Sequence, residues 1–487
     1  MILGFSPELS SYISFSICYM KNCLFIISCL FATALFSQSV TPLPPLPSKE
    51  QLQWHEKEFY LFIHFGPNTF TDREWGLGNE DPSVFNPTAL DCEQWARIAK
   101  QAGAKGIILT AKHHDGFCLW PSKFSKHTVR ESKWMDGKGD VVKALSEACQ
   151  KTGIEMGVYI SPWDRNHPLY GTPEYNDVYI STMKELLTNY GKFFELWWDG
   201  ANGEGPNGKK QVYDFRRFED SVFTWQPQLV VFSDIGPSIR WCGNENGTIN
   251  STNWNLLDTA GFKRGNGGPP TDTLNRGNVN GKLWIPAEAD VSIRPGWFYH
   301  PAEDVKVKTP QTLFNLYMRS VGNGGNLLLN VPPDRTGQIN AADSAALVDF
   351  GKLRADAFKT DVFAKAYLSS YGKEDPSMNN LIDHNINTYW ASTQQDNTEI
   401  VIDLPRKKQF NSLVLEEMIN YGQRVQSFTI EVSDGNSFQP VYRGTTIGRK
   451  KIATFAKQDS DKIKIIITHA KAAPVLRGIS AYLINTL

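Results

Sequence analysis

From Phe59 to Asp334 the sequence alternates short, almost wholly apolar runs with amphipathic segments. A run that is apolar at nearly every position predicts a strand buried on both faces, as in a parallel sheet covered by helices. The glycine fingerprint of an open dinucleotide-binding sheet is absent. The repetition therefore predicts an α/β fold, a (β/α)8-like barrel. The predicted strands begin at Phe59, Gly106, Ile154, Phe193, Leu229, Leu283 and Asn326.

Helices are predicted between these runs, for example over 91–103, 140–153 and 175–191. Each places apolar residues at i, i+3 and i+4, and each ends at a glycine. A further helix over 340–358 is predicted to close the barrel domain. Beyond it, short alternating runs separated by turn residues predict an antiparallel β-sandwich, a jelly roll. The predicted organisation is a leader over 1–38, a barrel over 39–358 and a β-sandwich over 359–487.

The charge balance narrows the range of partners. The 487 residues hold 50 Lys and Arg against 51 Asp and Glu, a net charge of −1. We therefore expect no nucleic-acid partner, because nucleic-acid binding needs a basic face. An aromatic content of 12%, with 14 Trp, suits both a large core and the stacking of sugar rings.

The first 38 residues contain the most apolar stretch of the chain. Met20 and Lys21 precede an apolar run of about 13 residues and then small residues, the pattern of a secretory signal peptide. The run is shorter than the roughly 20 residues of a membrane span. We expect translation to start at Met20, no membrane span and an exported protein, periplasmic or extracellular. A lipid anchor on Cys29 is the less favoured alternative.

Seven cysteines are present, of which Cys18, Cys23 and Cys29 fall in the leader. The others show neither zinc-site spacing nor the density of a disulfide framework. Buried free thiols are the favoured interpretation, and disulfides stay open. These four are Cys92, Cys118, Cys149 and Cys242.

Polar and aromatic side chains follow most of the predicted barrel strands. Catalytic residues of parallel barrels gather at the carboxyl ends of the strands. A polar rim with aromatic walls is what a monosaccharide pocket requires, because hydroxyls need hydrogen-bond partners and C–H faces need flat rings. The strand ends supply His64, His113, His114, Trp163, Asp164, Asp199, Asp234, Glu288 and Asp334.

A metal site is the alternative interpretation of the histidines, since His is a common metal ligand. Adjacent residues of a strand face opposite sides, so His113 and His114 are poorly placed to hold one ion. No HxxxH or CxxC pattern is present. We therefore expect no metal here and no required cofactor.

Four motifs make the barrel recognisable: "LFIHFGPNTF" from Leu61, "EWGLGN" from Glu74, "TAKHHDGFCLW" from Thr110 and "LWWDG" from Leu196. Together they resemble the α-L-fucosidases of glycoside hydrolase family 29. Two further segments, "GPSIRWCGNENG" and "WIPAEADVSIRPGWFY", resemble the branch that acts on α-1,3- and α-1,4-linked fucose.

The segment "LIDHNINTYWAS", followed by "VIDL" and "FTIEVSDG", resembles a discoidin-like (coagulation-factor C-type) domain. Such domains bind carbohydrate or buttress a neighbouring domain. The sequence leaves open whether this domain binds sugar or a structural calcium ion.

The fucosidase resemblance implies retaining hydrolysis of terminal L-fucose from a fucosylated oligosaccharide or glycan, through a covalent fucosyl-enzyme. This reaction needs two carboxyl groups about 5–5.5 Å apart. Asp199, in "WWDG", matches the nucleophile, although an Asp here can also cap the following helix. Glu245 matches the acid/base of the 1,3/1,4 branch. Glu288 is the second candidate for the acid/base, or a substrate-binding residue.

The resemblance further implies that three histidines bind fucose hydroxyls, with two residues of a nearby loop: His64, His113, His114, Glu74 and Trp75. Tyr159, Trp163 and Trp197 line the pocket or pack in the core. Two other functions stay open: a retaining glycosidase of altered sugar specificity, for example galactoside-directed, and a catalytically silent glycan-binding protein. The sequence does not indicate an oligomeric state.

Overall fold

The computed structural model describes residues 40–265 and 267–485. The predicted leader and its cysteines lie outside the described residues. Within those two ranges, no helix has the length and apolar character needed to cross a membrane.

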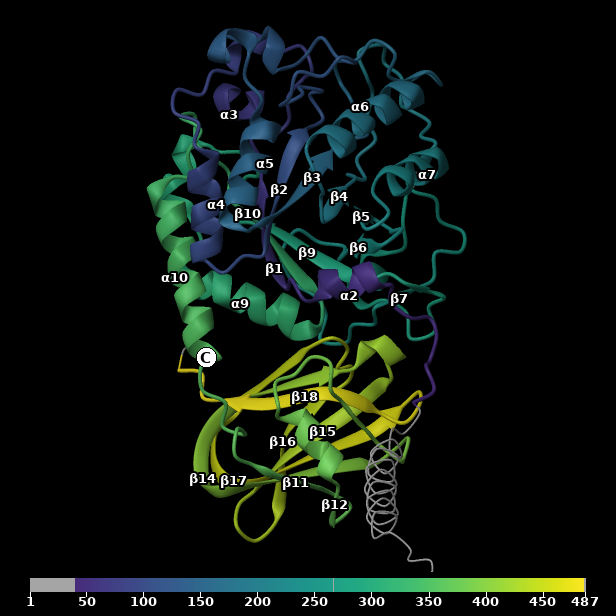
Figure 1. The fold of residues 1–487 in the computed structure, drawn as a ribbon, viewed down its shortest axis with the longest axis vertical. Helices are drawn as coiled ribbons and strands as arrows, with labels where there is room; N and C mark the ends of the chain where they lie inside the picture. Colours follow the sequence, from purple (N-terminus) through teal and green to yellow (C-terminus); the bar gives the residue numbers. More distant parts are fainter. Residues whose placement is uncertain (1–39, 266, 486–487) are drawn as a thin grey trace, which may run out of the picture. The chain divides into compact units, whose positions relative to one another are not determined.

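A closed barrel of eight parallel strands forms the first domain, which confirms the predicted fold class (Figure 1). Around the barrel the strands follow the order β1-β10-β9-β6-β5-β4-β3-β2. Nearly every strand residue is buried, because helices or loops cover the outer face of each strand. The strands are β1 Phe59–Ile63, β2 Gly106–Lys112, β3 Glu155–Ile160, β4 Glu195–Trp197, β5 Val230–Ser233, β6 Ile239–Trp241, β9 Ala287–Ser292 and β10 Asn326–Asn330.

Two strands differ from the prediction. Strand β6 is only three residues long and follows β5 without an intervening helix, so it leaves no periodic signal. The run from Leu283 was predicted as one strand, and this was wrong. It forms β8 Leu283–Trp284, which pairs with β7 Leu256–Leu257 outside the barrel, and then the barrel strand β9. Pro286 separates β8 from β9, because proline has no N–H to donate to a ladder.

The predicted helices are confirmed as α4 Cys92–Gln101, α5 Val141–Thr152, α6 Tyr175–Asn189 and α10 Ala341–Ala357. Asp91 and Asp140 cap α4 and α5 by accepting a backbone N–H three residues further on. The remaining helices are α2 Lys49–His55, α3 Pro67–Thr71, α7 Phe215–Trp225, α8 Thr271–Arg276 and α9 Pro310–Ser320. Short 3-10 turns are η1 Pro82–Val84, η2 Val129–Glu131, η3 Trp134–Gly137, η4 Pro301–Lys306, η5 Val321–Asn323, η6 Pro376–Leu381 and η7 Ile419–Tyr421.

Four cysteines lie within the described ranges, and all four are buried free thiols, as expected. They are Cys92, Cys118, Cys149 and Cys242. Burial raises the pKa of the Cys149 thiol to about 12, so this thiol stays protonated. The sulfur atoms therefore contribute packing rather than chemistry.

An antiparallel β-domain follows α10, which confirms the predicted class of the second domain (Figure 1). Its strands β14 and β17 are 20 residues each and pair along most of their length. Register shifts in this pairing mark β-bulges, which bend a strand so that its two halves can join different sheets. The strands are β11 Tyr367–Ser370, β12 Lys373–Glu374, β13 Trp390–Ala391, β14 Thr398–Glu417, β15 Val425–Ser433, β16 Phe438–Gly444, β17 Lys451–Ala470 and β18 Val475–Tyr482.

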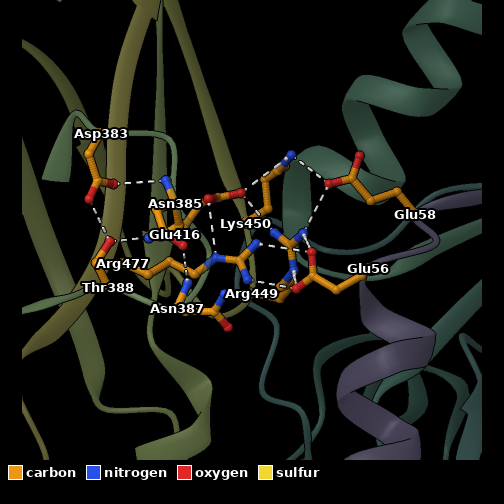
Figure 2. A network of polar contacts seen from close by, with 10 residues as sticks. All are labelled: Glu56, Glu58, Asp383, Asn385, Asn387, Thr388, Glu416, Arg449, Lys450 and Arg477. Atoms are coloured by element: carbon orange, nitrogen blue, oxygen red, sulfur yellow. Dashed lines mark hydrogen bonds and ion pairs between the residues drawn. The ribbon is translucent and has the colours of Figure 1, made fainter. Parts of the chain in front are cut away.

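A network of three acids and three bases joins the β-domain to the barrel (Figure 2). Arg449 donates to Glu56 and Glu416, both at 2.7 Å. Lys450 lies 2.5 Å from Glu58, and Arg477 lies 2.6 Å from Glu56. Because Glu56 and Glu58 belong to the turn between α2 and β1, these ion pairs attach the β-domain to the start of the barrel.

Candidate active site

Asp199 lies directly beyond β4, whose inward-facing residue Trp197 is part of the barrel interior. One carboxylate oxygen, Oδ1, accepts the backbone N–H of Ala201 at 2.7 Å, and Oδ2 accepts the Tyr159 hydroxyl at 3.1 Å. The Nε2 atom of His114 lies 3.8 Å from Oδ2. The side chain is 25% exposed. The two hydrogen-bond donors thus stabilise the ionised Asp199 carboxylate, while its exposed side stays accessible to a substrate.

A continuous arc of rings, here called the ring arc, lines the carboxyl ends of the barrel strands. Its neighbouring ring centres lie 4.2–5.7 Å apart, the range of favourable aromatic contacts. Tyr159 joins the arc by stacking on His113, and Trp197 packs beside Tyr159. Trp75, at one end, is 53% exposed. In order, the arc contains Trp297, His64, His113, His114, Trp163 and Trp75.

The tautomer of His64 follows from its neighbours. Asn330 donates its side-chain N–H groups to Ser292 Oγ and Trp297 O, so its Oδ1 faces His64. The Nδ1 atom of His64 must therefore donate to Asn330 Oδ1, at 2.9 Å. Burial lowers the pKa of His64 to about 3, so the ring is neutral. Its Nε2 is left as a hydrogen-bond acceptor.

His114 repeats this arrangement. The Ser161 hydroxyl donates to Trp163 O at 2.7 Å, so its oxygen accepts from Nδ1 of His114, also at 2.7 Å. Burial lowers the pKa of His114, although Asp199 opposes the shift. Burial also lowers the pKa of His113, whose Nδ1 lacks a hydrogen-bond partner among the described residues. All three imidazoles are therefore neutral, and His114 is the one that lies beside Asp199.

Glu245 lies on the exposed loop after β6, at the opposite end of the arc from Trp75. Its Oε2 accepts the indole N–H of Trp297 at 3.3 Å. Partial burial raises the pKa of Glu245, and the charges of Asp199 and Glu74 raise it further. Glu74 itself accepts the backbone N–H of Trp297 at 3.0 Å and contacts His300 at 2.8 Å. Glu74 thus holds the segment that carries Trp297.

Glu288 lies in the barrel interior and is 0% exposed. Trp197 donates its indole N–H to one oxygen at 2.8 Å, and the Tyr60 hydroxyl donates to the other. Glu195, also buried, is coupled to it: burial and the charge of Glu288 raise the pKa of Glu195 well above its usual value. Glu288 therefore lies beneath Trp197 and not on the rim.

The sequence predicted that the polar strand ends all face one pocket, but Asp164 and Asp334 do not face the ring arc. Asp164 is buried in an ion pair with Lys112 at 2.9 Å and accepts the Tyr175 hydroxyl. Asp334 lies in a turn, where it accepts the backbone N–H of Thr336. Among the residues that the structure describes, no three His, Cys, Asp or Glu side chains are grouped to hold a metal ion.

Two further aromatic residues of the site were not selected from the sequence. Trp297 and Phe298 pack on His64, with ring centres 5.2 and 5.3 Å away. The aromatic pair after Gly296 is the signal that could have identified them. Asp234, after β5, has no hydrogen-bond partner within 40–265 and 267–485, and burial together with Asp199 raises its pKa to about 6.

Comparison with known proteins agrees with this geometry. A family model described as alpha-L-fucosidase matches residues 49–357, and one described as a NedA-like galactose-binding domain matches 380–465. The chain is 40% identical over 462 residues to Alpha-L-fucosidase 1 of Arabidopsis thaliana, covering 93% of this chain and 90% of that protein.

Solved structures give the same result. The crystal structure of SpGH29 matches with a TM-score of 0.86 and 37% identity, covering 91% of this chain and 100% of that one. A Ruminococcus gnavus GH29 fucosidase in complex with fucose matches with a TM-score of 0.83 and 31% identity, covering 92% and 97%.

Fold and site together define a glycoside hydrolase with a barrel catalytic domain. More narrowly, the chain belongs to the α-L-fucosidases of glycoside hydrolase family 29, and it carries a galactose-binding-type domain at its C-terminal end. The family resemblance of the sequence motifs is thereby confirmed.

Proposed function

We propose that the chain is a retaining exo-α-L-fucosidase that removes α-1,3- or α-1,4-linked L-fucose from branched glycans. The observation that carries the proposal is the position of two carboxyl groups on one ring arc. Asp199 contacts Tyr159 and His114 near its middle, and Glu245 contacts Trp297 at its end. A sugar ring over the arc would have an acid on each side of its glycosidic bond.

Asp199 is the proposed nucleophile. Its ionised form is supported by the Ala201 N–H and the Tyr159 hydroxyl. Burial and Asp199 keep the pKa of Tyr159 well above 10, so Tyr159 stays a neutral donor. In the first step, an Asp199 oxygen bonds to C1 of fucose while the bond from C1 to the glycosidic oxygen breaks.

Glu245 is the proposed acid/base. Its raised pKa makes Glu245 hold a proton more readily than an ordinary glutamate, and it can give this proton to the leaving glycosidic oxygen. In the second step, Glu245 takes a proton from water, whose oxygen attacks C1 and releases Asp199 with net retention. Glu288 is disfavoured, because it is fully buried and both of its oxygens already accept hydrogen bonds.

The neutral imidazoles are proposed to bind the fucose hydroxyls. Nε2 of His64 and Nε2 of His114 are acceptors, since both Nδ1 atoms already donate. Trp75, Trp163 and Trp297 offer flat faces to the C–H groups of the sugars. The linkage preference is supported by the two branch motifs, which carry Glu245 and Trp297. Export to the periplasm or the medium is proposed from the leader.

Azide rescue tests the two candidates for the acid/base. With an activated aryl fucoside, Glu245→Ala should recover turnover in azide and form α-fucosyl azide, because azide replaces water without needing a base. Glu288→Ala should not form this adduct. Rescue of Glu288→Ala alone would overturn the assignment. Proton NMR of the first product tests retention: α-L-fucose should appear before mutarotation.

A further inference from the structure

The loop that carries Glu245 begins a long segment that replaces a barrel helix. Between β6 and β9 the described residues, which exclude 266, form only the short α8 and the pair β7 and β8. From Cys242 to Asn255 it forms neither helix nor strand. Backbone N–H and C=O groups of such a segment need partners from elsewhere when they are buried. Those partners decide where Glu245 is held.

The turn around Glu245 is closed by asparagine side chains of the barrel domain. Asn275 donates to Cys242 O at 2.8 Å and to Thr248 O at 3.0 Å. Asn244 also donates to Thr248 O, at 3.0 Å. These bonds fix the shape of the turn, but they attach it only to itself and to α8. The barrel domain holds the two ends of the turn, because the Cys242 N–H donates to Glu288 O at 3.0 Å and the Ile249 N–H donates to Arg319 O at 2.9 Å. The stretch beyond Ile249 has further contacts.

The following residues are held by the β-domain. Gln423 accepts the N–H of Asn255 at 2.8 Å and donates to Asn253 O, also at 2.8 Å. It thus bonds two backbone groups of a segment whose other backbone bonds go to the barrel domain, such as Trp254 N–H to Arg276 O at 2.7 Å. Thr446 accepts the N–H of Asn253 at 2.8 Å. Gln423 is 1% exposed, so water does not replace these bonds.

Lys451 provides a second attachment closer to Glu245. Its Nζ donates to Ser251 O at 3.0 Å and to the side-chain oxygen of Asn323 at 2.8 Å. Asn323 in turn donates to Ile249 O at 2.8 Å. Lys451 is 2% exposed and makes no ion pair among the described residues. Its ammonium group instead donates hydrogen bonds to a backbone oxygen and a side-chain amide oxygen of the barrel domain.

The anchoring side chains are themselves held rigidly within the β-domain. The buried carboxylate of Glu417 accepts the N–H groups of Arg424 at 2.7 Å, Val425 at 3.0 Å and Gly448 at 2.7 Å. These groups lie next to Gln423 and close to Thr446. The ion pairs of Arg449 and Lys450 in Figure 2 belong to the same stretch of chain, so residues 446–451 dock on the barrel as one unit.

We infer that Gln423, Thr446 and Lys451 are positioning residues for the acid/base loop, and that the β-domain is a working part of the fucosidase site. The inference rests on the proposed role of Glu245. Removing Gln423 and Thr446 as partners leaves the buried N–H groups of Asn253 and Asn255 and the carbonyl of Asn253 unpaired, which favours other loop conformations. Glu245 then moves relative to Asp199. Substrates whose leaving group must be protonated should react more slowly, whereas an activated substrate should still form the fucosyl-enzyme.

The test compares two substrates in the full-length chain. α-L-Fucosyl fluoride has a leaving group that needs little protonation, whereas a fucosylated Lewis-type trisaccharide needs a full proton. Gln423→Met removes both amide bonds at similar volume, and Thr446→Val removes one bond with a milder effect on folding. We expect kcat on the trisaccharide to fall at least tenfold for Gln423→Met and severalfold for Thr446→Val. On the fluoride, kcat/KM should stay within twofold for both, because this quantity reports formation of the fucosyl-enzyme and not the second step, in which Glu245 acts as base.

The controls separate positioning from general damage. Gln439→Met makes the same change at an exposed site of β16 and should leave both activities unchanged. Thr446→Ser keeps the acceptor and should restore trisaccharide activity. Equal losses on both substrates, or none on either in folded Gln423→Met and Thr446→Val, would overturn the inference.

Glu245→Gln in the same assay tests the proposed function separately. If Glu245→Gln does not lower trisaccharide activity selectively, the role of Glu245 is wrong. If Glu245→Gln is selective and the anchor variants are not, only the positioning inference fails.

Discussion

Two groups of carboxyl side chains in this protein face opposite surroundings. In the first group, Asp199 contacts Tyr159 and neutral His114, Glu245 contacts Trp297, and buried Asp234 is influenced by the charge of Asp199. No Lys or Arg forms an ion pair with them in the described part of the chain. Those at the domain interface, such as Glu58, each contact a guanidinium or ammonium group (Figure 2).

The pKa values of Glu245 and Asp234 are therefore shifted in the opposite direction from that of Glu58. Burial raises the pKa in both places, but at the interface Lys450 and Arg449 outweigh it and lower the pKa of Glu58 to about 2. At the ring arc nothing opposes burial strongly, so the pKa of Glu245 rises and that of Asp234 rises to about 6. The absence of a counter-charge lets a carboxyl group hold a transferable proton, whereas its presence makes the group a structural anion.

The largest effect is expected at the arc. Asp199→Asn should lower kcat on 4-nitrophenyl fucoside by about 10⁴-fold or more, because an amide cannot form the fucosyl ester. Asp349→Asn, at an exposed position of α10, is the matched control and should be silent. Turnover of Asp199→Asn within about a hundredfold of the parent would contradict the nucleophile assignment.

Glu245→Gln should lower kcat on a glycan by about 10²- to 10⁴-fold, the usual contribution of a general acid. The loss in kcat/KM, which reports the first step, should shrink as the leaving group becomes more acidic, and a series of aryl fucosides measures it. Glu147→Gln, on the exposed face of α5, controls for the substitution itself. A loss independent of the leaving group would mean that Glu245 is not the proton donor.

At the interface, the expected effect is on stability. Arg449→Met should lower the free energy of unfolding by about 2 kcal/mol, because it removes one of the cations that partly buried Glu56 and Glu416 share. Denaturant titration measures this. Lys352→Met breaks an exposed ion pair with Asp349 and should cost less than about 1 kcal/mol. Equal losses of unfolding free energy in Arg449→Met and Lys352→Met would show that the interface network stabilises the fold no more than an exposed ion pair does.

Acid should weaken the interface in a defined direction. Because the pKa of Glu58 is lowered in the folded state, its contribution is complete above about pH 4.5 and is lost as pH falls toward 2. Wild type should exceed Glu58→Gln by about 2 kcal/mol at pH 6, and the difference should shrink at pH 4 and again at pH 3. Urea titrations at the three values measure it. A difference that grows on acidification would reverse the sign and refute the assignment.

The smallest effect is expected at Asp234. Its pKa of about 6 means that it is neutral below this pH and anionic above it. The anion should stabilise the positive charge that develops on the sugar in the transition state. Asp234→Asn should therefore lower kcat/KM about threefold to tenfold above pH 6, and hardly at all below pH 5. A uniform loss across a pH profile would point to altered packing instead.

Much of the fold could be predicted because burial leaves a local pattern. The runs at Phe59, Gly106 and Asn326 became barrel strands, and α4 and α5 begin at the aspartates that precede them. Strand β6 was missed because three residues carry no periodicity. The run from Leu283 was taken as one strand because hydrophobicity does not show which sheet a strand joins.

The site could be predicted only in part for a related reason. Asp199 and the histidines follow strands, and motifs marked them. Residue type alone did not separate Glu245 from Glu288: the structure leaves one on an exposed loop and buries the other under Trp197. Trp297 and Asp234 follow β9 and β5 without a motif that assigns them a role.

By itself, the sequence determined the class of fold, the family and the residue types of the site, because periodicity and short motifs are properties of neighbouring residues. Tertiary structure decided which carboxyl groups are paired with a base, which imidazole nitrogens are free, and that Gln423 and Lys451 hold a loop nearly two hundred residues earlier in the chain. Those features arise where distant segments exclude water together, and local sequence does not encode that packing.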